Sequence, residues 1–420
     1  MKKVLLIAAT TGYQIRSFGE AAERLGIRLV FASDRCDQLD DPWCDEAIPV
    51  RFHQVERSLQ AIAEVFGGRA PAGILAVGDR PTILAAHVAA HFGLPGNTPE
   101  SSNASANKLA TRQALQAAGL PTPAFRSVPL ESDPAALAGQ VTYPAVLKPL
   151  ALSGSRGVIR VNDAREFVAA FGRIVRLLQS TDVRIQHDPA HDGILVESFI
   201  EGCEFALEGV LSRGVLQPLA IFDKPDPLEG PFFEETIYLT PSRESETQQR
   251  RLEETVAAAA RALKLQHGPV HAECRMDGKD VYVLEVAARP IGGLCSRALR
   301  FESADGSSAS LEELLLRHAV GEDVSGYHRE NGASGVMMIP IPRRGIYRGV
   351  EGVGDAAAVS GIEDVRITTK PDTLLVPLPE GRSYLGFVFA RAHAPAEVEQ
   401  ALRTAHTRLQ FSIEKEISVI

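Results

Sequence analysis

Two glutamates and an arginine within one short segment have the types and the spacing for phosphate chemistry. Glu273 and Glu285 lie on either side of Asp277-Gly278, a dipeptide that favours a tight turn between two strands. The alternation of apolar and polar residues in VYVLEV, residues 281–286, predicts that both carboxylates face one cleft. Mg²⁺ prefers oxygen ligands, and an arginine such as Arg289 can neutralise a transferring phosphoryl group. The segment therefore predicts a site for Mg²⁺ and a phosphate-bearing substrate.

Two lysines upstream favour nucleotide binding over the alternative, a surface hairpin whose charges are only solvated or paired. Lys108 lies in NKLATRQALQAAG, and Lys148 lies in the short predicted strand VLKP. A loop of small residues, SGSRG at 153–157, follows, and its backbone N–H groups can approach phosphate oxygens. The chain contains neither G-x4-G-K-[ST] nor a G-x-G-x-x-G after its first strand, which argues against the P-loop and dinucleotide-binding folds.

The order of these residues along the chain resembles the ATP-grasp superfamily. In that family two lysines, a glycine-rich lid, a hinge glutamate, a ribose-binding glutamate and two acidic metal ligands surround ATP. The stretch LVESFIEGCEFALEGV supplies the two remaining glutamates, Glu197 and Glu204, at a spacing that is similar to the family's. The resemblance covers the middle part of the chain.

The resemblance implies a role for each residue of this set. Mg²⁺ or Mn²⁺ would be held by Glu273 and Glu285, and Arg289 would be the catalytic arginine. One departure is Ala287, which stands where the family commonly has a metal-binding asparagine, so a second metal ion would depend on the two glutamates and phosphate oxygens or bind more weakly. ATP would be bound through its phosphates by Lys108, Lys148, Ser153, Gly154, Ser155 and Gly157, through adenine by Glu197 and the backbone of Ser198, Phe199 and Ile200, and through ribose by Glu204.

The overall composition is that of a soluble enzyme. The chain has 420 residues with 45% apolar and 23% charged content, enough for about three domains. Its formal net charge of −9 argues against nucleic acid as a partner, because binding to a phosphate backbone needs a basic face. No apolar run of about eighteen residues occurs, so we expect no membrane span. The apolar run of the N-terminal MKKVLLIAATTG is too short for a secretory signal and predicts a buried strand.

The cysteines and the paired histidines predict neither disulfides nor a zinc site. His87 with His91 and His187 with His191 have a spacing that zinc can use, but no third cluster of ligands accompanies them, which favours ordinary exposed histidines. The cysteines are odd in number and lack paired metal spacing, so we expect reduced thiols in the cytoplasm. They are Cys36, Cys44, Cys203, Cys274 and Cys295.

The hydrophobic pattern and the resemblance together predict an α/β protein of three domains. Residues 1–97 alternate strand and helix signals and predict an open parallel α/β sheet. The resemblance implies an ATP-grasp domain over 98–305, with a lid subdomain at about 122–200. Residues 306–420 predict a C-terminal α+β domain, whose layout and phrases PLPEG and YLGFVFAR resemble the C-terminal domain of L-amino-acid ligases.

Particular elements and strand ends are predicted within these domains. The pattern indicates a hairpin around Arg213-Gly214, a long helix over 244–265 and a closing helix over 397–411. Open parallel sheets bind ligands at the carboxyl ends of their strands. Thr10-Thr11-Gly12 and Gly78-Asp79-Arg80 are therefore additional candidates.

The resemblance implies an ATP-dependent carboxylate–amine ligase. Such an enzyme would transfer the γ-phosphoryl group to a carboxylate, let an amine attack the acyl phosphate, and release ADP and phosphate. Amino acids are the expected substrates, and relatives often form homodimers. The proline- and acid-rich segment 223–241 fits neither strand nor helix periodicity and is expected to be a loop over the acceptor substrate. The substrate candidates are Lys224, Phe232, Glu235 and Tyr238 in this segment, His271 as acceptor of the amine proton, and Arg297 as partner of a substrate carboxylate.

Two other functions stay open. An ATP-dependent carboxylase or nucleotide-precursor synthetase of the same superfamily would share the ATP site and would differ in its dependence on bicarbonate. A non-catalytic ATP-binding regulatory protein is suggested by Ala287, and it would bind ATP without turnover.

Overall fold

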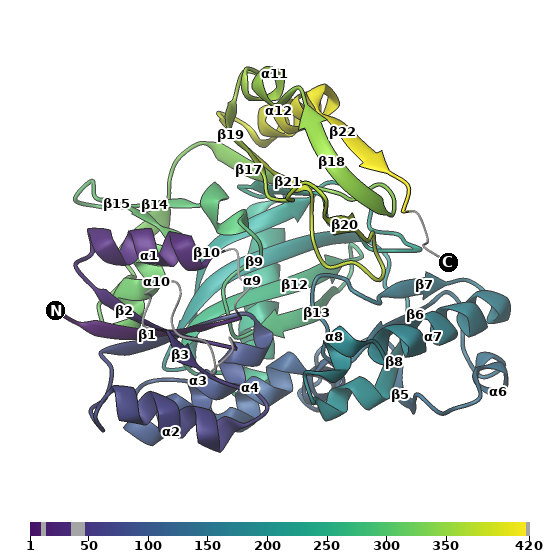
Figure 1. Cartoon of the computed structure of the whole chain (residues 1–420), viewed down its shortest axis with the longest axis horizontal. Coiled ribbons are helices and arrows are strands. Elements are labelled where there is room, and N and C mark those ends of the chain that lie inside the picture. The colour runs from purple at the N-terminus through teal and green to yellow at the C-terminus, as the bar shows by residue number, and fades with distance from the viewer. Residues whose placement is uncertain (10–13, 35–46, 417–420) are drawn as a thin grey trace.

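The N-terminal part of the chain is an open parallel sheet, as predicted, and apolar clusters lie on both of its faces. The computed structural model describes residues 1–9, 14–34 and 47–416; Thr10, Thr11, Gly12, Cys36 and Cys44 lie outside this part. Leu5 and Ile7 of the first strand face a different apolar cluster from Val4 and Leu6, because successive side chains of a strand alternate between faces. The sheet order β3-β2-β1-β4 comprises β1 (Lys3–Ala8), β2 (Arg28–Ser33), β3 (Ile48–Pro49) and β4 (Gly73–Val77), with helices α1 (Ile15–Arg24), α2 (Val55–Val65) and α3 (Asp79–Phe92) (Figure 1).

The segment predicted as the lid is a four-stranded antiparallel sheet with one long helix against it. Helix α7 (Ala164–Leu178) begins at Asp163, whose side chain accepts a hydrogen bond from the Glu166 N–H. Its apolar residues recur at helical spacing and pack on the sheet. The sheet order β5-β8-β6-β7 comprises β5 (Phe125–Pro129), β6 (Ala145–Pro149), β7 (Ile159–Val161) and β8 (Gly193–Ser198), preceded by helices α4 (Pro99–Ala106) and α5 (Lys108–Ala117) and joined by α6 (Pro134–Ala138), α8 (Thr181–Arg184) and the 3-10 turn η1 (Pro189–Asp192).

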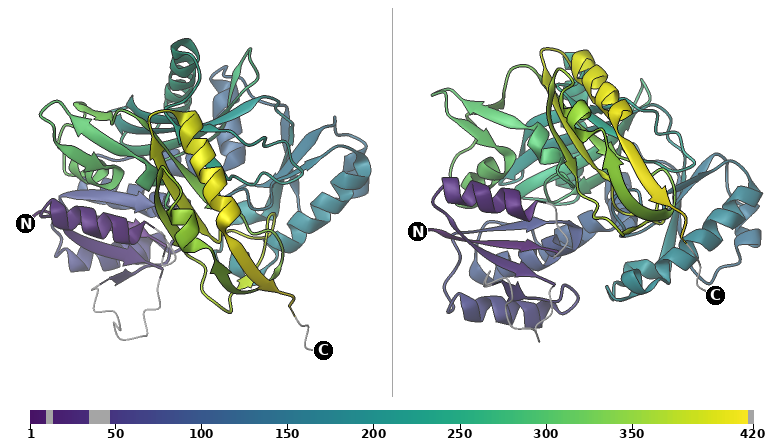
Figure 2. Two further views of the ribbon diagram at one scale, coloured as in Figure 1. Left: turned by 90° about the horizontal axis from the view of Figure 1, so that it is seen from above. Right: turned by 45° about the horizontal axis from the view of Figure 1, so that its top comes forward.

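An antiparallel sheet of eight strands forms the centre of the molecule. It runs across position 305, so strands on both sides of that predicted boundary share one hydrogen-bonded ladder; the division into domains stays a prediction. Its order is β13-β12-β9-β10-β11-β17-β21-β19, with β9 (Cys203–Ser212), β10 (Val215–Lys224), β11 (Ile237–Thr240), β12 (Gly268–Met276), β13 (Val281–Ala287), β17 (Ala333–Ile339), β19 (Ile362–Ile367) and β21 (Gly386–Ala392). Helix α9 (Glu246–Ala262) covers one end, and α11 (Val353–Ala357) and α12 (Pro395–Arg408) cover the other (Figures 1 and 2).

The smaller elements confirm some local predictions and correct others. The hairpin around Arg213-Gly214 is present, with positive φ at both residues. The segment 223–241 is irregular only in its middle, because β10 extends to Lys224 and β11 begins at Ile237. The predicted closing helix ends at Arg408, and a strand follows. The remaining elements are η2 (Cys295–Ala298), β14 (Arg300–Ser303), β15 (Ser308–Ser310), α10 (Leu311–Ala319), β16 (Tyr327–Arg329), β18 (Gly345–Glu351), β20 (Leu374–Leu375) and β22 (Gln410–Glu414). Among the described residues, no helix combines the length and the apolar character that a membrane crossing requires.

Candidate active site

A cavity of about 370 Å³ gathers most of the predicted site residues from distant parts of the chain. Asp79 of the N-terminal part, Lys148 of the lid, Glu273 of the central sheet and Met338 of the C-terminal part all line it. Of the sequence candidates it brings together Asp79, Lys108, Lys148, Ser153, Gly154, Ser155, Glu197, Ser198, Phe199, Ile200, Glu204, Glu235, Tyr238, His271, Glu273, Glu285 and Arg289. Gly157, Lys224, Phe232 and Arg297 are not on the lining.

The predicted hairpin places two carboxylates side by side on the cavity wall. Glu273 of β12 and Glu285 of β13 are direct cross-strand partners, and the turn between the strands begins at Asp277. A bulge follows, because Cys274 pairs with Val283 and leaves Leu284 as an extra residue that also lines the cavity. The hairpin prediction is thus confirmed, and both carboxylates face the cavity as the alternation required.

Glu285 stands between two cations. Its Oε2 lies 3.5 Å from Lys108 Nζ, and its Oε1 lies 3.5 Å from Arg289 Nη2. Lys108 Nζ also donates a 2.7 Å hydrogen bond to the Leu152 carbonyl, at the edge of the glycine-rich loop. Among the described residues, neither oxygen of Glu285 accepts a hydrogen bond, so the two 3.5 Å ion pairs are the contacts that a metal ion on this carboxylate would have to share or replace.

Arg289 is fixed from the N-terminal part of the chain. Its Nε donates to Asp79 Oδ1 at 2.6 Å and its Nη2 to Asp79 Oδ2 at 3.4 Å, a forked contact that orients the guanidinium. Burial raises the pKa of Asp79, but the ion pair with Arg289 outweighs burial and holds that pKa below its ordinary value. Asp79 is thus a positioning partner, whereas Arg80 lies 5.0 Å over the Phe52 ring and is not on the lining.

Glu197 is buried between two cations, one of which the sequence analysis missed. Arg112 is fully buried and donates from Nε to Glu197, and Lys148 Nζ pairs with the other carboxylate oxygen. Although burial raises the pKa of Glu197, Lys148 and Arg112 hold it below its ordinary value. Arg112 lies four residues after Lys108 on helix α5, a spacing that shares one helix face and was the available signal.

Removing one member of this group is expected to destabilise the fold. The substitution Arg112→Met should lower the free energy of unfolding by about 3–5 kcal/mol, because it leaves a buried carboxylate with one partner fewer. Urea unfolding measures this loss. Arg250→Met is the matched control, since Arg250 lies 3.9 Å from Glu246 on the exposed face of α9. A loss for Arg112→Met no larger than that of the control would contradict the prediction.

Lys148 gives nucleotide binding an expected pH dependence. Burial lowers the pKa of Lys148 to about 8, although the Glu197 carboxylate raises it. Phosphate oxygens bind the protonated amine, so above pH 8 the protein must take up a proton on binding. The affinity for a non-hydrolysable ATP analogue with Mg²⁺ should therefore fall about tenfold from pH 7 to pH 9, as calorimetry can measure. Lys148→Met should bind more weakly with a flat profile; equal slopes in both proteins would refute the assignment.

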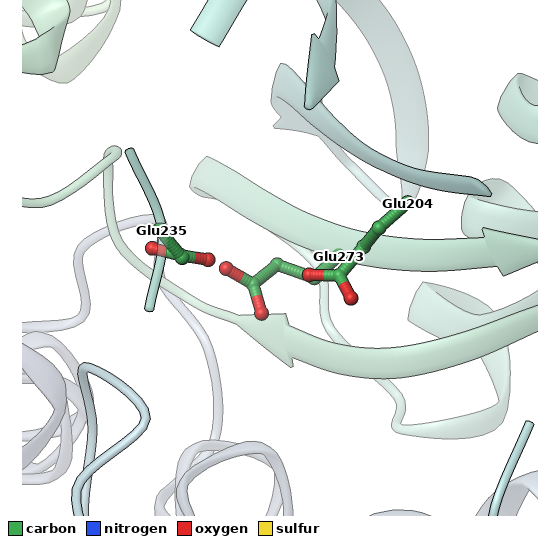
Figure 3. A group of neighbouring side chains, drawn as sticks. All are labelled: Glu204, Glu235 and Glu273. Carbon is green, nitrogen blue, oxygen red and sulfur yellow. The ribbon is translucent and has the colours of Figure 1, made fainter. Parts of the chain in front are cut away.

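Lys224 lies behind the lining at the centre of three carboxylates. Its Nζ donates to Glu204 Oε1 at 2.8 Å, to Glu273 Oε1 at 3.1 Å and to Glu235. Figure 3 shows these carboxylates side by side. Burial and the neighbouring Glu273 raise the pKa of Glu235 to about 7. The predicted substrate contact of Lys224 is corrected: its ammonium neutralises the buried acidic group and is not free for a substrate.

Arg275 contacts both Glu204, the predicted ribose-binding residue, and the hinge, residues 197–200, where adenine is predicted to bind. Its Nε donates to Glu204 Oε2 at 3.0 Å and its Nη1 to the Ile200 carbonyl at 2.6 Å. The Ser198 and Phe199 N–H groups already donate to the carbonyls of Ala124 and Pro144, so these two donors are not free for adenine. Among the described residues, the Ile200 N–H has no backbone acceptor. The hinge therefore offers one free N–H to a ligand.

His271 lies between the carboxylates of Glu208 and Glu273. Its Nδ1 contacts Glu208 Oε1, and its Nε2 lies 3.6 Å from Glu273 Oε1. Burial lowers the pKa of His271, but these two carboxylates outweigh burial and raise it to about 9. An imidazole that is protonated at neutral pH cannot accept the proton of an amine, so this arrangement does not support the predicted base.

Arg297 and Gly157 have other roles than the predicted ones. Arg297 Nη1 pairs with Asp364 at 3.1 Å and its guanidinium lies over Phe389, so the substrate contact predicted for it is corrected. Gly157 has φ +75°, and a Cβ there would come within 2.7 Å of Pro149. It is therefore a turn residue that lets the glycine-rich loop pack closely on the lid.

The acidic residues fit a divalent cation. Glu273 and Glu285 present two carboxylates on one wall, and carboxylate oxygens are the ligands that Mg²⁺ prefers. Glu204, Glu235 and Glu273 also offer oxygens within 4.8 Å of one another, but the Lys224 ammonium already neutralises that group. The cross-strand pair is therefore the better candidate for the cation.

Comparison with known proteins agrees with this geometry. A family model described as an ATP-grasp domain matches residues 141–298, and one described as L-amino acid ligase C-terminal domain 2 matches residues 337–414. The crystal structure of an L-amino acid ligase from Bacillus licheniformis is similar at 26% identity and a TM-score of 0.82, covering 99% of each chain. The alanine–anticapsin ligase of Bacillus subtilis strain 168 is 26% identical over 60% of this chain and 54% of its own length.

A third comparison concerns the fold alone. The crystal structure of N5-carboxyaminoimidazole ribonucleotide synthetase from Thermotoga maritima has a TM-score of 0.68 and 14% identity, covering 99% of this chain and all of that one. The stretch that matches the ATP-grasp domain, residues 141–298, contains most of the candidate residues that line the cavity. The chain thus combines a stretch that matches an ATP-grasp domain, residues 141–298, with a stretch that matches the C-terminal domain 2 of L-amino acid ligases, residues 337–414, and over its whole length it is similar in fold to an L-amino acid ligase.

Proposed function

We propose that the protein joins the carboxylate of one amino acid to the amine of another, with an acyl phosphate as intermediate and ADP and phosphate as products. The observation that carries the proposal is the convergence of Lys108, Lys148 and Arg289 with Glu273 and Glu285 on one cavity. These cations suit a triphosphate, and the carboxylates suit its metal ion. The resemblance to L-amino acid ligases supports amino acids as the substrate class.

The lysines and the hinge would hold ATP in the cavity. Lys108 and Lys148 would neutralise the phosphates, Ser153 to Ser155 would offer backbone N–H groups, and the Ile200 N–H would receive adenine. Glu204 would bind ribose only with an oxygen lone pair that Lys224 and Arg275 leave free. Mg²⁺ held by Glu273 and Glu285 would offset the negative charge that builds up on the phosphate oxygens.

Arg289 would steady the transferring phosphoryl group and then the acyl phosphate. The carboxylate oxygen attacks the γ-phosphorus and ADP leaves; the amine then attacks the acyl carbon and inorganic phosphate leaves. Asp79 orients the Arg289 guanidinium before either step, so Arg289 is a preorganised source of positive charge. The amino-acid substrates would lie against the part of the cavity lined by Glu235, Tyr238 and Tyr384.

The test is Mg²⁺-dependent release of ADP and phosphate across a library of amino-acid pairs, with bicarbonate as a separate acceptor. Release that requires two amino acids, together with a dipeptide mass, is the expected result. Release with bicarbonate in place of amino acids would point to a carboxylase or nucleotide-precursor synthetase. Binding of ATP without release under any condition would point to a regulatory protein. The homodimer, the cytoplasmic location and Mn²⁺ as an alternative cation stay predictions.

A further inference from the structure

We propose that Arg173 of helix α7 is a positioning residue that keeps the glycine-rich loop closed over the nucleotide. It would do so by joining the lid to two segments that carry acceptor-side residues: segment 376–384 of the C-terminal part and segment 225–236, which precedes β11. The inference rests on the proposed function, because its consequence is the protection of an acyl phosphate from water.

Arg173 contacts both segments with one side chain. Its Nη2 donates to Glu380 Oε2 at 2.8 Å, and its Nε donates to Glu380 Oε1, which makes a forked contact. The same guanidinium lies 5.0 Å from the centroid of the Phe232 ring. The fork requires the planar guanidinium of arginine and fixes how helix α7 faces the two segments.

The segment that binds Arg173 also binds the glycine-rich loop through its backbone. The Gly157 N–H donates to the Pro379 carbonyl at 2.8 Å, and Arg156 Nε donates to the Glu380 carbonyl at 2.8 Å. Ser153 to Ser155 of the same loop line the cavity. The position of Glu380 therefore determines where the loop lies over the phosphate end.

Both segments reach the acceptor side of the same cavity. Tyr384 follows Glu380 by four residues and lines the cavity. Phe232 forms a strand bridge with Ile159 of the lid, and the Arg160 N–H donates to the Pro231 carbonyl at 2.9 Å. Glu235, three residues after Phe232, lines the cavity. A shift of helix α7 would therefore move the loop and the acceptor side together.

The ion pair between Arg173 and Glu380 is weak enough for the lid to open and close repeatedly. The side chains of Arg173 and Glu380 are 39% and 35% exposed, and ion pairs at such exposure are weak. A weak pair can separate in every cycle to release ADP, while the forked geometry restores one closed position. Loosening it would admit water, which hydrolyses an acyl phosphate before the amine attacks.

The experiment measures phosphate released per amide bond formed, together with kcat and the KM for ATP. Arg173→Ala and Glu380→Gln should each raise the ratio of phosphate to amide about 2- to 5-fold, the range expected for a surface ion pair. The double variant should do no more than Arg173→Ala alone, because that substitution already removes the fork with Glu380 together with the contact to Phe232. Arg317→Ala is the matched control, since Arg317 pairs with Glu322 at similar exposure on helix α10, and it should leave the ratio unchanged. Unchanged ratios in both single variants, or additive effects, would overturn the proposal.

A second readout separates this proposal from the proposed function. Amide hydrogen exchange of residues 153–157 with Mg²⁺ and a non-hydrolysable ATP analogue needs no turnover. Exchange should be faster in Arg173→Ala and Glu380→Gln than in the wild type and in Arg317→Ala. If no pair of amino acids supports ADP release, the proposed function fails while this exchange still reports on the contact. Equal exchange in all four proteins would overturn the role of Arg173.

Discussion

Replacing Arg289 by alanine is expected to lower kcat about 10²- to 10³-fold, the loss that follows removal of one preorganised donor from a developing charge. The guanidinium is held by Asp79 at 2.6 Å and lies 3.5 Å from Glu285, so it is in place before substrate binds. The KM for ATP should change little, because Lys108 and Lys148 remain. Steady-state assays of ADP release, with binding of a non-hydrolysable ATP analogue, measure both quantities.

Three variants make this result interpretable. Arg289→Lys keeps the charge but cannot form the fork with Asp79, so it should recover only part of kcat. Asp79→Asn keeps Arg289 but weakens its orientation and should give a smaller loss than Arg289→Ala. Arg300→Ala is the control, because Arg300 pairs with Glu363 on the surface. A kcat for Arg289→Ala close to that of Arg300→Ala, in a folded protein that binds nucleotide, would exclude the catalytic role.

Local patterns in the sequence predicted those parts of the site that lie on one hairpin. The alternation in VYVLEV and the Asp277-Gly278 turn are short-range signals, and the structure places Glu273 opposite Glu285 as they require. The sequence did not reveal the bulge at Leu284, because a single extra residue leaves no distinct pattern in an otherwise alternating strand. The open parallel sheet at the N-terminus was predicted for the same reason, because the spacing of apolar residues within each segment distinguishes strands from helices.

Contacts between distant segments could not be predicted. Lys224 sits in a proline- and acid-rich stretch, and only the pairing of β10 with β9 reveals that its ammonium meets Glu204. Arg297 follows the β12–β13 hairpin closely along the chain, yet its guanidinium pairs with Asp364 of β19 and is not on the cavity lining. Long-range packing decides whether such a charged residue meets a substrate or a carboxylate of the chain.

The helix boundary at the C-terminus was wrong for a related reason. The residues up to Phe411 continue an apolar pattern that a helix can use, but Gln410 to Glu414 pair with β18. A strand partner that lies about sixty residues upstream satisfies those backbone groups, and its identity is not visible locally. The eight-stranded sheet contains another pairing of this kind, since β11 pairs with β17 across the predicted domain boundary.

The second large effect concerns the cation site. Two sets of residues could form it: the cross-strand pair Glu273 and Glu285, and the cluster of Glu204, Glu235 and Glu273 around Lys224. Glu285→Gln is expected to lower kcat about 10³-fold at a fixed Mg²⁺ concentration, which corresponds to several kcal/mol of lost charge stabilisation. The amide retains the shape of the side chain, and no described hydrogen bond to Glu285 is lost. Glu273→Gln should have a similar effect on kcat but also weakens the neutralisation of Lys224, so its stability should fall as well.

The comparison that decides between the two groups is Glu285→Gln against Glu235→Gln. Kcat measured as a function of Mg²⁺, and binding of Mn²⁺ with a non-hydrolysable ATP analogue, should both weaken in Glu285→Gln. Glu235→Gln should keep metal binding, because Lys224 already neutralises the group of Glu204, Glu235 and Glu273. Glu302→Gln is the control for loss of a surface carboxylate, because Glu302 is an exposed residue of β14. If Glu235→Gln lost the metal ion and Glu285→Gln retained it, the cation would belong to the group around Lys224, and Lys224 would have to move aside when the metal binds.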